Sequence, residues 1–131
     1  MIMINENKFN TIWTVSRYFY GLVPILIGAD KFFFFIVNWN IYVSTYAASM
    51  IPPMYLVPGI GIIEIVAGLM ILTRWPRLGA YLVAAFIGII IINLFMIGGL
   101  LDIILRDAAI IFGYVMFGML TELKETSQPS L

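Results

Sequence analysis

Cysteine and histidine are both absent from the 131 residues of this sequence. Without cysteine the chain cannot form disulfides, thiol redox relays or thiolate metal sites. Without histidine it also lacks the commonest metal and haem ligand. We therefore expect no metal site and no redox centre held by this chain alone. The eight methionines are interpreted as packing or lipid-facing residues.

Charge is also scarce. Only 11% of the residues are charged, and seven basic residues balance seven acidic ones. Soluble domains carry about a quarter of charged residues. The balance leaves no basic excess for nucleic acid and no polybasic segment for anionic lipid, so we expect no nucleic-acid partner. Hydrophobic residues make up 63% of the chain, which predicts an integral membrane protein surrounded by lipids.

The sequence contains several long apolar segments. A membrane-spanning helix needs about 20 apolar residues, and four segments qualify. The chain is therefore predicted to be one all-α domain over residues 1–131, an integral membrane four-helix bundle. The spans are expected at about 11–31, 54–73, 79–100 and 103–120, followed by a polar tail at 121–131.

The segment between the first two spans is too polar to cross a membrane alone. It contains Trp39, Tyr42 and Tyr46, aromatic residues of the kind that favour the headgroup level. It ends at Pro52 and Pro53, where proline disfavours helix in the preceding residue. We interpret this segment as a short interfacial helix or a re-entrant segment.

Basic residues indicate the orientation. Cytoplasmic loops carry an excess of lysine and arginine, which predicts that both termini are cytoplasmic. No cleavable signal is evident, so the first span is expected to act as an uncleaved insertion signal. A bacterial inner (plasma) membrane fits this pattern. The basic residues on the predicted cytoplasmic side are Lys8, Arg74, Arg77 and Lys124, and those at the other end are Lys31 and Arg106.

Small and polar residues form a seam on each predicted helix. In the first span the seam follows steps of three and four, which places its members on one face. In the second span Glu64 lies between Gly61 and Gly68 on one face. Glycines on such faces let helices approach closely in membranes. The first seam contains Arg17, Gly21, Pro24, Gly28 and Lys31.

Ionisable residues within spans are costly and usually face the bundle interior. We predict that Glu64 points inward and pairs with Arg17. Two interpretations stay open: the pair fixes helix register, or it lines a polar cavity for a ligand headgroup or a proton. Arg17, Tyr20 or Asn93 would then donate hydrogen bonds to the ligand. A second cluster is expected at the outer end, with Lys31 and Arg106 pairing with aspartates; its members are Asp30, Lys31, Asp102, Arg106 and Asp107.

The order of these features resembles the DoxX-like family of small four-span membrane proteins. The motifs that carry it are Arg17 with the later "GADKFF", then "GIGIIEIVAGLMIL", "TRWPRLGAYL" and "LRDAAIIFGY". The resemblance covers nearly the whole chain, although Asn93 in the third span has no counterpart in the pattern. It implies a four-helix architecture and association with membrane redox complexes, since relatives include subunits of quinone-linked sulfur oxidation.

We predict an accessory subunit of a membrane redox complex, quinone-linked and without its own redox centre. Its ligand would be a quinone or a lipid, and its partners other membrane protein subunits. No nucleotide loop or nucleophilic triad is present, so no catalytic residues are predicted and enzymatic activity stays open. The alternatives are a non-catalytic scaffold or assembly factor for a membrane protein complex, and, ranked last, a small transporter.

Overall fold

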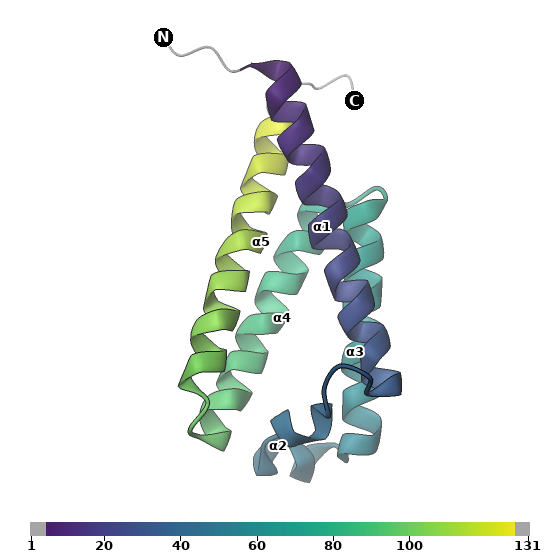
Figure 1. Ribbon diagram of the computed structural model, residues 1–131, viewed down its shortest axis with the longest axis vertical. Coiled ribbons are helices and arrows are strands. Elements are labelled where there is room, and N and C mark those ends of the chain that lie inside the picture. Colours follow the sequence, from purple (N-terminus) through teal and green to yellow (C-terminus); the bar gives the residue numbers. More distant parts are fainter. Residues whose placement is uncertain (1–4, 128–131) are drawn as a thin grey trace.

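A computed structural model describes residues 5–127 and is all-α within that range. Four of its helices are long and apolar enough to cross a membrane, as predicted. A short 3-10 turn and a short helix lie between the first two spans (Figure 1); their depth in the membrane remains a prediction. The elements are α1 (Glu6–Phe33), η1 (Trp39–Tyr42), α2 (Thr45–Met50), α3 (Pro53–Leu72), α4 (Pro76–Ile97) and α5 (Leu101–Ser127).

The helix ends differ most from expectation at the carboxyl terminus. Helix α5 continues to Ser127, so residues 121–127 of the predicted polar tail belong to the helix, and residues 128–131 lie outside the described range. Burial and a hydrogen bond at Thr121 stabilise the start of these extra turns. Thr121 is buried and accepts a hydrogen bond from Trp13 Nε1 at 2.9 Å.

Helices α1 and α3 form the tightest pair in the fold, packed antiparallel through glycines. A Cβ built on Gly28 would lie 2.5 Å from the carbonyl oxygen of Gly61, and one built on Gly68 would lie 2.5 Å from the carbonyl oxygen of Gly21. No real side chain fits there, so the two backbones are in direct contact. These two glycine pairs fix the axial register of α1 against α3.

Helices α4 and α5 form the second antiparallel pair, and α3 packs on α4. Helix α1 meets α5 near the described termini and diverges from it toward η1 and α2 (Figure 1). At the converging end Trp13 stacks on Phe117, and Tyr20 meets Tyr114 edge to face at 4.7 Å. The short elements η1 and α2 lie at the diverging end, which is called the outer end below.

Large apolar side chains cover the outward faces of the bundle. Val15, Leu26, Ile92 and Phe112 are each more than 60% exposed. Soluble monomers rarely expose apolar surface of this extent to water, whereas lipid tails solvate it favourably. The fold and its surface together define a small multi-span integral membrane protein. The basic residues Lys8, Arg74, Arg77 and Lys124 lie toward the end where α1 begins and α5 finishes; the cytoplasmic assignment of that end stays a prediction.

Candidate ligand-binding site

The partner of Glu64 is Lys31. The Lys31 Nζ atom lies 2.6 Å from Glu64 Oε1, and the two side chains are only 8% and 15% exposed. Both residues belong to the α1–α3 contact, where Gly28 and Gly61 bring the backbones together. No neutral donor within the described chain hydrogen-bonds Glu64 Oε1, so the lysine ammonium is what compensates this carboxylate.

Arg17 lies elsewhere, and the expected Arg17–Glu64 pair is wrong. Its Nε donates to the carbonyl oxygen of Ile71 at 2.9 Å, and its Nη2 donates to the carbonyl oxygen of Thr73. These carbonyls belong to the last turn of α3 and the residue that follows it, where a cation is favoured by the helix dipole. The guanidinium carbon also lies 5.2 Å from the centre of the Trp13 ring. The glycine-fixed register places Arg17 opposite this helix end.

The Lys31 ammonium is enclosed from a second side. It lies 3.8 Å from the centre of the Trp39 ring, within the range of a cation–π contact. Trp39 belongs to η1, which follows the tight turn after α1, where Phe34 adopts a left-handed conformation with φ of 58°. The ammonium is therefore held between a carboxylate of α3 and an indole ring of η1.

Asp30 holds the turn that brings Trp39 to Lys31. Its carboxylate accepts the backbone N–H groups of Phe35, Ile36 and Val37 at 2.8, 2.9 and 3.3 Å. It also accepts the Trp39 indole N–H at 2.8 Å. With four donors, this carboxylate is saturated. Lys31 was expected to pair with Asp102, Asp107 or Asp30, and that expectation is wrong, because Lys31 pairs with Glu64 and Asp30 caps the loop.

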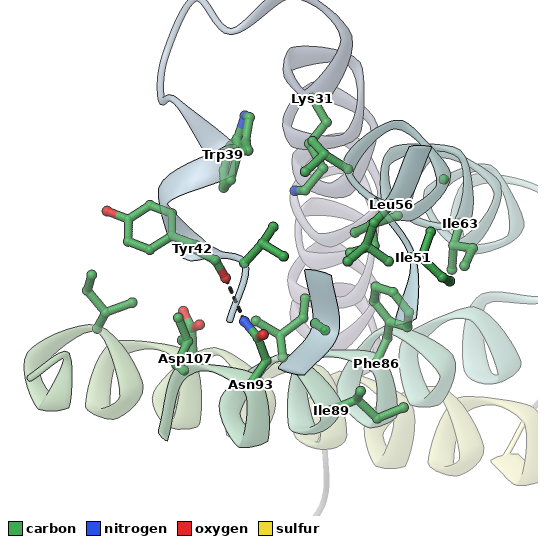
Figure 2. Close-up of a pocket in the computed structure, with 18 of the residues that line it drawn as sticks. Lys31, Trp39, Tyr42, Ile51, Leu56, Ile63, Phe86, Ile89, Asn93 and Asp107 are labelled. Carbon is green, nitrogen blue, oxygen red and sulfur yellow. Dashed lines mark hydrogen bonds between the residues drawn. The ribbon is translucent and has the colours of Figure 1, made fainter. Parts of the chain in front are cut away.

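Asn93 anchors the other end of the same connection. Its Oδ1 accepts the backbone N–H of Ser44 at 2.9 Å, and its Nδ2 donates to the carbonyl oxygen of Tyr42 at 2.6 Å. Figure 2 shows the second bond as a dashed line between Asn93 of α4 and Tyr42, the last residue of η1. Asn93 was expected to donate to a ligand; its amide is instead committed to the loop.

A cavity of about 440 Å³, here called the outer cavity, lies under this loop. Figure 2 shows apolar side chains such as Leu56, Ile63 and Phe86 around it, with Lys31 and Trp39 at one side. The polar members of its wall are few, as is usual for small-molecule sites. They are Lys31, Trp39, Tyr42, Tyr55, Asn93, Arg106 and Asp107.

A smaller cavity of about 170 Å³, here called the inner cavity, adjoins it. Lys31, Trp39 and Phe86 line both cavities, whereas Glu64 and Tyr114 line only the inner one. Lys31 thus lies between the two spaces, with its carboxylate partner on the inner side.

The remaining charged residues of the predicted outer cluster are only partly brought together. Arg106 contacts its neighbour Asp107 at 3.3 Å, with side chains 65% and 11% exposed, and both line the two cavities. The expected pairing of Arg106 with an aspartate is thus met by Asp107. Asp102 is exposed and lines neither cavity.

Tyr20 is not part of either cavity wall. Its backbone carbonyl accepts the Tyr114 hydroxyl at 3.0 Å, and its ring packs against Tyr114, Phe117 and Phe19. Of the four residues predicted to line a site, Glu64 and Asn93 therefore reach the cavities, and Arg17 and Tyr20 do not. Trp39 and Phe86 were missed as wall residues, since their sequence positions signal only an interfacial aromatic and a span residue.

Among the described residues, no three of the acidic, cysteine or histidine type come together to hold a metal ion. The arrangement offers charge-paired cations beside an apolar space. Comparison of the chain with family models, with curated proteins and with solved structures gives no match.

Proposed function

We propose that this protein is an accessory subunit of a quinone-linked redox complex in the bacterial inner (plasma) membrane. It holds a lipid-soluble ligand, a quinone or a lipid, in the outer cavity, and other subunits carry the redox centres. The observation that carries the proposal is the outer cavity itself: an apolar space of about 440 Å³ with a buried, paired ammonium in its wall. The DoxX-like resemblance of the sequence supports the assignment to a redox complex.

The cavity suits a ligand delivered from the membrane. Its size falls within the range of about 300–1,000 Å³ common for small-molecule sites. Its wall is built largely of aliphatic and aromatic side chains from α2, α3, α4 and α5, which favours an apolar tail. Lys31 and Arg106 supply N–H groups for a headgroup. The predicted ligand thus has one small polar end and one apolar body.

The test is extraction of the protein from its native membrane in lipid discs, followed by mass spectrometry of retained lipids and subunits. Ala47 lines the outer cavity, so the larger side chain of Ala47→Phe should occupy part of the cavity and reduce retention of the ligand. Ser49→Phe is the matched control, because Ser49 lies on the same short helix, is exposed and lines neither cavity. Recovery of the wild-type chain alone, with no quinone, no other enriched lipid and no partner, would contradict the proposal.

A scaffold or assembly factor is the second candidate, favoured by the aromatic run that ends α1. Phe33 and Phe35 are 66% and 86% exposed and stack on each other at 5.8 Å. Such a surface fits a neighbouring subunit as well as lipid. Photo-crosslinking from position 35 should then capture a defined membrane protein in native membranes. Capture of lipid alone would leave this candidate without support.

A further inference from the structure

We infer that the ligand of the outer cavity has an electrically neutral headgroup with a carbonyl-type acceptor, which Lys31 receives. This inference rests on the proposed function, namely that the outer cavity binds a lipid-soluble ligand. It narrows that ligand to one chemical class and excludes headgroups that carry a phosphate or carboxylate.

Each of the two cations around the cavities already has a carboxylate partner. Lys31 pairs with Glu64 at 2.6 Å, and Arg106 contacts Asp107 at 3.3 Å. Asp30 adds a carboxylate on the loop side, saturated by four N–H donors. The five groups together carry a formal charge of minus one. An anionic headgroup would meet no uncompensated cation and would lie close to the carboxylates of Glu64 and Asp107, which is an unfavourable arrangement in a low-dielectric site.

The polar groups in the wall of the outer cavity that can still form hydrogen bonds are mainly N–H donors. An ammonium has three N–H groups and a guanidinium has five. One side of the Lys31 ammonium faces Glu64 and another faces the Trp39 ring, which leaves a donor for a third partner. Arg106 directs its Nε and Nη2 at a single Asp107 oxygen, so further N–H groups remain on this exposed side chain.

Most neutral polar groups of the wall already form hydrogen bonds that hold the connection between α1 and α2. Both ends of the Asn93 amide bind backbone groups, and the Trp39 indole N–H binds Asp30. Tyr42 and Tyr55 also line the cavity; a tyrosine hydroxyl both donates and accepts, so these residues do not discriminate between a neutral and an anionic headgroup. A neutral acceptor gains a charge-assisted hydrogen bond from Lys31 without displacing Glu64, whereas an anion must compete with it.

The test uses the full chain in zwitterionic lipid nanodiscs, labelled with ¹⁵N-tryptophan. The chain has three tryptophans, and the Trp39 indole N–H lies at the site. Trp39→Phe assigns its signal, and Trp75, 55% exposed on the α3–α4 connection, is the internal reference. The probes are decylubiquinone, dioctanoylglycerol and dioctanoylphosphatidylglycerol.

We expect decylubiquinone to shift the Trp39 signal saturably and leave Trp75 unchanged, and dioctanoylphosphatidylglycerol neither to shift it nor to compete. The double variant Lys31→Met/Glu64→Gln removes the donor without stranding a charge and should weaken binding by about tenfold, the loss expected for one charge-assisted hydrogen bond. Lys8→Met, exposed near the start of α1, is the matched control and should bind normally.

Saturable binding of dioctanoylphosphatidylglycerol that depends on Lys31 would overturn the inference. So would neutral-ligand binding that the double variant leaves unchanged. Binding of dioctanoylglycerol but not of decylubiquinone would support the neutral headgroup and contradict the quinone-linked function. No response of Trp39 to any probe would show that the cavity is not a ligand site, and the proposed function would fail first.

Discussion

At the scale of single residues, the Lys31–Glu64 ion pair compensates two charges that are buried between membrane-spanning helices. Removing one partner of a buried ion pair leaves the other charge uncompensated, at a cost of about 3–5 kcal/mol. Glu64→Leu should therefore lower the free energy of unfolding by about 3 kcal/mol, measured by steric trapping in bicelles. Adding Arg17→Met to Glu64→Leu should not restore the lost stability, because Arg17 hydrogen-bonds the carbonyl oxygens of Ile71 and Thr73 and not Glu64.

The control for this prediction is the double variant Lys31→Met/Glu64→Leu. It removes both charges and replaces them with apolar groups, a change that is often neutral or stabilising. We expect it to recover most of the stability lost in Glu64→Leu. Equal losses in the single and double variants would mean that the two side chains do not compensate each other.

The sequence predicts the inward position of Glu64 but not its partner, and the reason is geometric. Helical periodicity places Arg17 and Lys31 on the same face of α1, fourteen residues and so about 21 Å apart along the axis. Periodicity fixes the face that a helix buries and leaves its axial register against a neighbour open. Here Gly28 and Gly61 set that register, and it brings Lys31, rather than Arg17, to Glu64.

At the scale of elements, the glycine contact between α1 and α3 is what sets the distance between these helices. Gly28→Ala or Gly61→Ala puts a methyl group about 2.5–2.6 Å from a backbone oxygen, which a flexible side chain cannot relieve. Each substitution should cost about 1–3 kcal/mol in the same unfolding measurement. Gly59→Ala is the matched control, since the space around Gly59 is open and alanine favours helix by about 0.5–1 kcal/mol. A greater loss in Gly59→Ala than in Gly61→Ala would contradict the packing.

The connection between α1 and α2 is held at both ends, by Asp30 and by Asn93. Asp30→Ala removes the acceptor of three backbone N–H groups and of the Trp39 indole. We expect amide hydrogen exchange at residues 35–37 to accelerate at least tenfold, the equivalent of one lost hydrogen bond of about 1.4 kcal/mol, measured by mass spectrometry.

Exchange in the α4–α5 turn is the internal control for the loop prediction, since Asp30 accepts no hydrogen bond from it. Unchanged exchange at residues 35–37 would mean that Asp30 does not hold the loop. The sequence could not anticipate this role. A lone aspartate next to a lysine at a helix end looks like part of a charge cluster, and only the left-handed turn at Phe34 aims the following N–H groups back at it.

At the scale of the whole molecule, composition and apolar run length were sufficient to predict four spans and an all-α fold, because the bilayer admits few other structures. They were insufficient to predict how the helices are arranged at the outer end. Whether α1 stays beside α5 or diverges from it depends on side-chain volumes in three dimensions, such as Trp13, Tyr20 and Phe117 at the converging end. The cavities follow from that divergence and leave no sequence signal of their own.

The fold places the described ends of the chain on one side of the bundle (Figure 1). The chain has no cysteine, so single cysteines report topology without background. Cysteines at Asn10 and Arg77 should react with an impermeant maleimide only after cells are permeabilised, and cysteines at Asn40 and Gly99 should react in intact cells. Reaction of positions 10 and 40 from the same side would contradict the arrangement.

The proposed ligand site depends on the ion pair of Lys31 and Glu64 beside the outer cavity. The most direct measurement is the dipolar coupling between lysine ¹⁵Nζ and glutamate ¹³Cδ by solid-state NMR of the full chain in bilayers. We predict a strong coupling at salt-bridge distance that Lys31→Met removes from the spectrum and Lys8→Met preserves. A spectrum that Lys31→Met leaves unchanged, or no coupling in the wild-type protein, would contradict the ion pair.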